Sequence, residues 1–196
     1  MRLVSAELLA RIPVPKAAKA AAIQLLCDVF ASAFDVVAPK LRRIETAANG
    51  SPDTAHAGIQ RPDLWAFRTF SAACMDAALE SHAFSAQCIG RLYEHAFSLG
   101  TKVRRVLNPR PSELPVLVHL FYALIEIDVV CFPSGELVFN RCYFSGGYTP
   151  AQCAFMSAFD SGFVGGLHGG GRLEFSARIT QGAPCCRACL VEREVL

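Results

Sequence analysis

The segment from residue 124 to residue 144, LIEIDVVCFPSGELVFNRCYF, decides the fold. Two runs rich in β-branched and aromatic residues, 124–132 and 137–144, flank the turn-forming Pro133-Ser134-Gly135-Glu136. Such residues favour strands, and proline and glycine mark the turn between them. The segment therefore predicts an antiparallel β-hairpin.

The chain downstream of this hairpin predicts one helix and a second hairpin. Thr149-Pro150 is typical of a helix N-cap followed by proline at the first helical position, so we expect a helix over 151–167. Runs 172–180 and 185–192 predict two further strands around a turn at 181–184. Between the helix and these strands, five glycines around His168 predict a flexible connector. The expected architecture is an antiparallel sheet of about four strands with one covering helix.

The chain upstream of the hairpin is mainly helical. Apolar residues recur at helical spacing over 15–46, 63–80 and 85–106, and a short helix is expected over 114–122. The stretch AANGSPDTAHAGIQRPD, residues 47–63, lacks periodicity and predicts a surface loop. Asn108-Pro109-Arg110-Pro111 marks a break. We therefore expect one α+β domain over 1–196, with a helical region at 1–108 and an α/β region at 109–196.

Composition limits the classes of partner. Hydrophobic residues make up 53% of the 196 residues and charged residues only 18%, which excludes a disordered chain. This apolar content predicts a thick core, a buried interface such as that of a homodimer, or both. The formal net charge is +2, without a long basic run, so nucleic acid is not an expected partner.

The N-terminal sequence and the cysteines indicate the compartment. Residues 1–30 lack the apolar core and cleavage site of a secretory signal, and no window of about 18 apolar residues is free of charge. We therefore expect a cytoplasmic protein without a membrane span. The nine cysteines are then expected to be thiols. Cys186 and Cys189 have the spacing of a metal-binding pair, but no second pair matches them, and no ligand set or cofactor follows.

The C-terminal half carries most of the residues with chemical potential. Cys142 and Cys186 end predicted strands beside glycine-rich loops, where functional residues tend to collect. Regular alternation along 172–180 places Phe175 and Ala177 on one face and Arg178 on the other, polar face. That face is either the solvated side of the sheet or the wall of a polar cleft. We expect Arg178 to point into a cleft, and Cys142 and Cys186 to share one cavity.

Three motifs occur in order in this half: Arg141-Cys142-Tyr143, then Cys153 and Asp160 on one helix, then Arg178, Gly182 and Cys186. The order resembles the C-terminal region of the L-2-amino-thiazoline-4-carboxylic acid hydrolase family. The last motif alone is also similar to 4-vinyl reductase ligand-binding domains. Two positions depart from the hydrolase pattern, Tyr143, where proline is common, and Arg187-Ala188, where an acidic and an aromatic residue are usual.

The resemblance implies hydrolytic ring opening of a cyclic amidine that carries a carboxylate. It implies that Cys142 or Cys186 supplies a thiolate and that Asp160 or His168 transfers protons. Arg178 or Arg141, beside Tyr143, would bind the carboxylate of this small-molecule substrate. Two other functions remain open, namely a non-catalytic domain that binds a ligand or senses metal or redox state, and a partner subunit of a complex.

Overall fold

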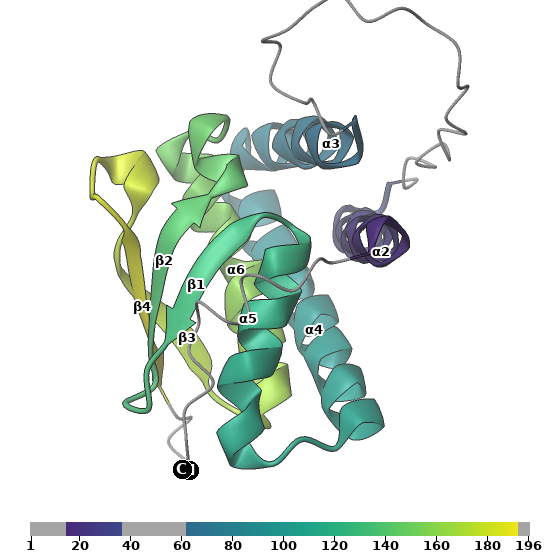
Figure 1. Ribbon diagram of the computed structural model, residues 1–196. Helices are drawn as coiled ribbons and strands as arrows, with labels where there is room; N and C mark the ends of the chain where they lie inside the picture. Colours follow the sequence, from purple (N-terminus) through teal and green to yellow (C-terminus); the bar gives the residue numbers. More distant parts are fainter. Residues whose placement is uncertain (1–14, 37–61, 192–196) are drawn as a thin grey trace, which may run out of the picture.

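The computed structural model describes residues 15–36 and 62–191 and has an α+β fold (Figure 1). The described order begins with helices α2 (Lys16–Phe34), α3 (Pro62–Leu79) and α4 (His82–Leu107). A short 3₁₀ turn η1 (Pro111–Glu113) leads into α5 (Leu114–Leu124). Then follow β1 (Ile127–Cys131), β2 (Glu136–Cys142), η2 (Tyr143–Gly146), α6 (Pro150–His168), β3 (Arg172–Ala177), η3 (Ile179–Gln181) and β4 (Cys186–Val191).

The four strands form one antiparallel sheet, as the sequence predicts, and their order in the sheet is β1-β2-β4-β3. Helices α5 and α6 lie against one face of the sheet, and α2, α3 and α4 form a further layer behind them (Figure 1). The other face of the sheet carries charged pairs such as Arg187 with Glu136 at 2.7 Å. The core therefore fills the space between the inner face of the sheet and the helices.

Helix α6 is the central helix of the fold. Its N-terminus is held by a capping box, in which the Thr149 hydroxyl accepts from the Gln152 backbone N–H and the Gln152 side chain accepts from the Thr149 N–H. The helix begins at Pro150 with Thr149 as its N-cap, which confirms the predicted pattern of an N-cap followed by proline. The most extensive helix contact is that of α6 with α4, where backbone of Gly166 on α6 approaches backbone of Phe97 on α4.

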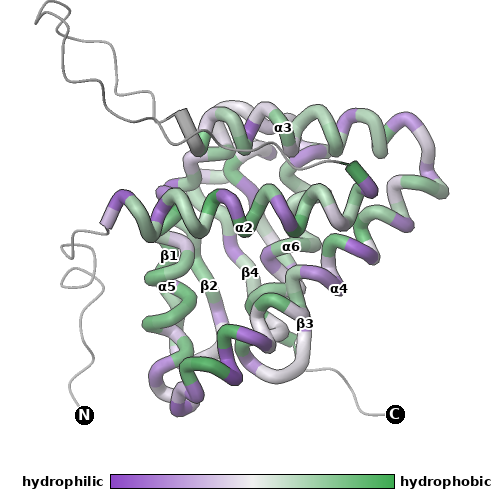
Figure 2. Tube along the Cα trace, turned by 90° about the vertical axis from the view of Figure 1, so that its right-hand side faces the viewer, coloured by the Kyte–Doolittle hydropathy of each residue, from purple (hydrophilic) through white to green (hydrophobic). Residues whose placement is uncertain are grey.

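The apolar composition of α5 and α2 explains why other elements of the protein pack against them. Figure 2 shows α5 as an almost continuously hydrophobic helix, and it packs between β1 and α6. Helix α2 is long and apolar enough to span a membrane by length and composition, with a mean hydropathy of 1.4 over its window. Half of that window is buried inside the protein, and core helices of soluble proteins pass the same test. This leaves the expected absence of a membrane span a prediction.

Several predicted boundaries are wrong. The first helix ends at Phe34, because Asp35 adopts a left-handed conformation with φ of 59°. The predicted strands 124–132, 137–144 and 172–180 are shorter, since Leu124 ends α5 and the segments Tyr143–Gly146 and Ile179–Gln181 are 3₁₀ turns. The predicted loop 47–63 and the part of the first helix after residue 36 lie outside the described residues, apart from the start of α3.

The predicted glycine connector is also partly helical. Gly165 and Gly166 are buried within α6, and the helix continues to His168. Gly169 ends it in the left-handed region, with φ of 93°, and donates its N–H to the Gly165 carbonyl. Gly166 allows close packing against α4, Gly165 allows close approach of the Gly171 backbone, and only the glycines at 169–171 form the connection to β3.

Candidate functional site

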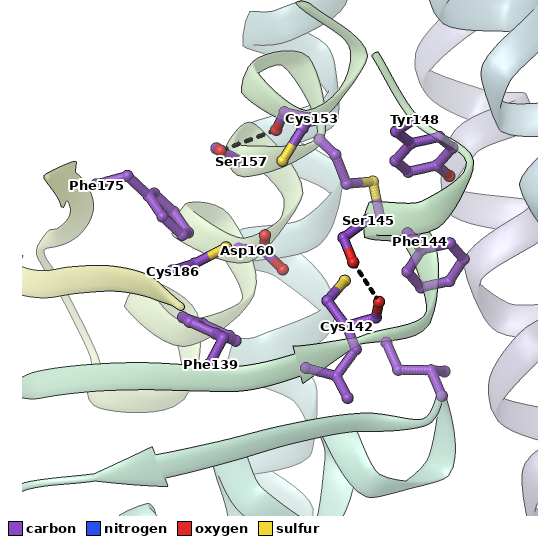
Figure 3. Close-up of a pocket in the computed structure, with 13 residues that line it drawn as sticks. Phe139, Cys142, Phe144, Ser145, Tyr148, Cys153, Ser157, Asp160, Phe175 and Cys186 are labelled. Atoms are coloured by element: carbon purple, nitrogen blue, oxygen red, sulfur yellow. Dashed lines mark hydrogen bonds between the residues drawn. The ribbon is translucent and has the colours of Figure 1, made fainter. Parts of the chain in front are cut away.

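A small cavity lies between α6 and the inner face of the sheet (Figure 3). Its volume is about 40 Å³, which holds a few water molecules. Most of its wall is apolar, and three thiols, three hydroxyls and one carboxyl interrupt it. The lining residues are Ile125, Ile127, Phe139, Cys142, Phe144, Ser145, Tyr148, Cys153, Met156, Ser157, Asp160, Phe175 and Cys186.

A β-bulge in β2 turns Cys142 toward this cavity. Asp128 pairs with Arg141 and Val129 with Phe139, so Asn140 is an extra residue on β2. Without the bulge, Phe139 and Cys142 would face opposite sides of the sheet, because they are three residues apart. The inserted residue restores Cys142 to the inner face. The same geometry leaves Arg141 exposed on the outer face.

A second bulge, in β3, turns Arg178 toward the inner face of the sheet. Phe175 pairs with Ala188 and Ala177 with Arg187, which makes Ser176 the extra residue. Beyond it the alternation is reversed, and the half-buried Arg178 lies over the Phe175 ring, 4.9 Å from its centroid. Arg178 thus reaches the inner face, as expected, although regular alternation had placed it opposite Phe175.

Helix α6 contributes a polar stripe to the cavity. Cys153, Ser157 and Asp160 occupy positions i, i+4 and i+7, which share one helix face. Figure 3 shows the Cys153 and Cys186 sulfur atoms and the Asp160 carboxyl turned toward the same space. The Ser157 hydroxyl accepts two long hydrogen bonds from the Arg178 guanidinium, at 3.3 and 3.4 Å. The stripe therefore connects the cavity to Arg178.

Within the described part of the chain, Asp160 is the only carboxyl group that lines the cavity. The hydroxyl of Tyr122, on α5, donates a hydrogen bond of 2.7 Å to Asp160 Oδ1. Burial raises the pKa of Asp160 to about 6, and the Tyr122 hydrogen bond and the Arg178 charge partly oppose this rise. A carboxyl that titrates near neutral pH can both accept and donate a proton, as a general acid–base requires.

The three cavity thiols are held in their protonated form. Burial raises the pKa of Cys142 to about 12, despite hydrogen bonds from the backbone N–H groups of Phe144 and Ser145. Burial also raises the pKa values of Cys153 and Cys186, and the opposing effect of the Arg178 charge is smaller. The structure therefore gives no support to the expected thiolate at Cys142 or Cys186.

The positive charge of Arg178 lacks a carboxylate partner. In the described part of the chain, no ion pair includes Arg178, and its guanidinium contacts only the Ser157 hydroxyl and the Phe175 ring. A guanidinium has five N–H donors arranged to bind a carboxylate through two parallel hydrogen bonds. Arg178 is thus a half-buried cation with donors left for an anion.

The structure brings together four of the seven predicted site residues. Cys142, Cys186 and Asp160 line the cavity, and Arg178 lies beside it. The role of each remains a prediction. Cys142 lies three residues along β2 from Phe139, the partner of Cys186, which corresponds to about 10 Å of strand. That offset exceeds the usual Cα separation of a disulfide, so the two thiols share a cavity without being placed to pair.

The other three predicted site residues lie elsewhere. Arg141 is exposed on the outer face of β2, for the reason given above. The Tyr143 ring is half-buried outside the cavity, with the Arg68 guanidinium 5.2 Å from its centroid. His168 is exposed at the end of α6, eight residues or about 12 Å of helix beyond Asp160. The structure therefore does not place these three residues at the cavity, and their roles stay predictions.

Sequence reasoning missed Ser157, Tyr122 and Tyr148, and it named Cys153 in a motif without assigning it a role. Cys153 and Ser157 carry a readable signal, because their spacing from Asp160 is that of one helix face. Tyr122 and Tyr148 carry none, because they reach the site only through the packing of distant segments. Tyr148 lines the cavity while its hydroxyl shares a buried hydrogen bond with the Ser71 hydroxyl on α3.

All nine cysteines are free thiols in the structure. Among residues 15–36 and 62–191, no group of three or more histidine, cysteine, aspartate or glutamate side chains is arranged to hold a metal ion.

Thiol alkylation should separate these cysteines by rate. At pH 8 we expect iodoacetamide to label the exposed Cys189 first and Cys142 about a thousandfold more slowly than an ordinary thiol, because a pKa of about 12 leaves little thiolate. Peptide mass spectrometry over time measures both rates, with the denatured protein as the control in which all nine react. If Cys142 were labelled as fast as Cys189, the hypothesis of a catalytic thiolate at Cys142 would stand again.

Comparison of the chain with protein-family models, with curated proteins and with solved structures gave no match.

Proposed function

We propose that the chain is a small hydrolase that acts on a compound carrying both a carboxylate and a basic nitrogen group, such as a cyclic amidine. One observation carries the proposal: a carboxyl with a pKa of about 6 lines the cavity, and beside the cavity lies a guanidinium that has no ion-pair partner among the described residues. Perturbed acids in a cavity are candidates for catalysis. The resemblance to the thiazoline carboxylate hydrolases points to the same substrate class.

The two charges suit the two ends of such a substrate. Arg178 would bind the carboxylate through two hydrogen bonds, replacing its long bonds to Ser157. Ionised Asp160 would take a proton from water as the water oxygen attacks the carbon between the ring heteroatoms. Protonated Asp160 would then return that proton to the leaving heteroatom as its bond to this carbon breaks. The neutral thiols would shape the cavity.

The cavity must widen to admit a ring, because about 40 Å³ holds only a few waters. The segments η2 and η3 contact each other beside it, and η2 provides Phe144 and Ser145 to its wall. Arg178 directly precedes η3, and its hydrogen bonds to α6 among the described residues are those to Ser157. Substrate would enter here, where carboxylate binding to Arg178 loosens the contact between η3 and α6.

Arg178→Lys should weaken substrate binding while leaving the fold intact. A lost charge-assisted hydrogen bond is worth about 1.5–3 kcal/mol, so KM for 2-aminothiazoline-4-carboxylate should rise about 10- to 150-fold. The same variant should bind 2-aminothiazoline, which lacks the carboxylate, as the wild type does. Steady-state kinetics with both compounds measure the difference.

Arg187→Lys is the matched control, because Arg187 lies on the outer face of β4 and pairs with Glu136. It should leave KM for both compounds unchanged. If wild type and Arg178→Lys had equal KM for the carboxylate compound, Arg178 would not bind a substrate carboxylate. If the protein turned over no cyclic amidine, the proposed hydrolase function would be rejected.

A second candidate is a non-catalytic ligand-binding domain. It is favoured by the apolar wall and the three neutral thiols, which suit a soft, uncharged ligand more than a reacting one. Native mass spectrometry of the protein purified without added ligand separates the two functions. A retained small molecule on a protein that hydrolyses no amidine would favour this candidate.

A further inference from the structure

We infer that Tyr122 is a positioning residue for Asp160: its hydroxyl engages one carboxyl oxygen and leaves the other free to exchange protons in the cavity. The inference rests on the proposed role of Asp160 as the proton-transfer group. It assigns a function to a side chain on α5, outside the three motifs in the C-terminal half.

The position of the Tyr122 hydroxyl is fixed by packing. Tyr122 is fully buried, and its ring meets those of Phe121 and Phe139 edge to face at 5.7 and 5.3 Å between centroids. From there the hydroxyl lies 2.7 Å from Asp160 Oδ1. A ring held on two sides cannot follow the carboxyl if it rotates, so the hydrogen bond fixes the rotation of the carboxyl.

The direction of this hydrogen bond does not change with pH. Burial and the neighbouring carboxyl raise the pKa of Tyr122 far above its usual value, so its hydroxyl stays protonated and donates. Oδ1 therefore accepts in both states of Asp160, and the titrating proton resides on Oδ2. Among the described residues Tyr122 is the only hydrogen-bond partner of this carboxyl, so Oδ2 is left to the cavity.

Other groups that face Asp160 cannot replace Tyr122. Arg178 acts on the carboxyl by its charge alone, because its donors contact Ser157. The remaining neighbours are acids that stay neutral, because burial, and to a smaller extent the charge of Asp160, raises their pKa values, namely Cys142, Tyr148, Cys153 and Cys186. Loss of the Tyr122 hydroxyl therefore removes the one hydrogen bond that favours ionised Asp160.

Tyr122→Phe tests the inference in the protein without substrate. The carbon-13 carboxyl signals of aspartate-labelled protein are followed against pH, and the signal lost in Asp160→Asn identifies Asp160. We expect the Asp160 midpoint to move upward by about one to two pH units in Tyr122→Phe, as loss of a hydrogen bond to a charged group predicts. In kinetics the acidic limb of kcat should move equally, with KM unchanged.

Tyr148→Phe is the matched control, since it deletes another buried hydroxyl of the cavity that bonds to Ser71 and not to Asp160. Its Asp160 midpoint should stay at the wild-type value. If Tyr122→Phe does not fold, 3-fluorotyrosine at position 122, a stronger donor, should move the midpoint downward. An unmoved midpoint in the folded Tyr122 variant overturns the inference, whereas failure of the hydrolase appears separately as absent turnover in the wild type.

Discussion

Gly166→Ala is expected to destabilise the protein by about 3 kcal/mol or more, at the upper end of the effects of overpacking. A Cβ atom at this position would lie 2.2 Å from the Phe97 carbonyl oxygen and 2.9 Å from the Thr101 nitrogen. Both are backbone atoms of α4, so no side chain can rotate away. Relief requires separation of α4 from α6, the largest helix contact of the fold. Urea denaturation monitored by circular dichroism gives the free energy of unfolding.

Gly90→Ala is the matched control on the other helix of the same pair. Gly90 lies within α4, and nothing comes within 4 Å of a Cβ added there. Alanine should therefore stabilise the protein by about 0.5–1 kcal/mol, through the lower conformational entropy of the unfolded chain. If both substitutions had the same small effect, α4 and α6 would not pack as closely as described.

The sequence predicts the elements of this fold better than their faces. The hairpin around Gly135 and the start of α6 at Pro150 are encoded by local signals, namely turn residues, a capping motif and strand-forming runs. Such signals act within a few residues, so tertiary packing seldom overrides them. The fold class and the strand order along the chain could therefore be predicted.

The faces could not be predicted, because they depend on single inserted residues. Asn140 and Ser176 each add one residue to a strand, which exchanges inside and outside for everything that follows. Arg141 and Arg178 both looked suited to bind a carboxylate, and the bulges place the first on the exposed outer face and the second on the inner face, beside the cavity. Neither bulge carries a glycine or proline that would mark it in the sequence.

The chemistry of the candidate site was predictable only in part, for a related reason. Cys142, Cys186 and Asp160 were identified by type and motif, but the protonation of each depends on burial and on groups distant in sequence. Burial holds Cys142 as a thiol and raises the pKa of Asp160, and Tyr122 approaches from 38 positions away. Sequence patterns give the inventory of groups, whereas packing decides which of them can transfer a proton.

Asp160→Asn is expected to stabilise the protein by about 2–3 kcal/mol at pH 8 and to have almost no effect near pH 4. The folded-state pKa of Asp160 is raised from 3.8 to about 6, so between these values the folded protein holds a proton that the unfolded chain has released. Its contribution to stability therefore falls as the pH rises through this window, by about 3 kcal/mol in full. Asparagine avoids this cost, because it is neutral and still accepts from Tyr122. Urea denaturation of both proteins at each pH measures the effect.

Asp28→Asn separates this effect from a general response to lost negative charge. Asp28 is exposed on α2, so its replacement should give the same small difference in unfolding free energy at pH 4 and pH 8. A loss of stability in Asp160→Asn at pH 8, or a difference in unfolding free energy that does not change with pH, would show that burial does not raise the pKa of Asp160. The predicted gain in stability, together with a loss of activity in Asp160→Asn, would be typical of a functional residue. Such a residue is retained at a cost in stability because the reaction needs it.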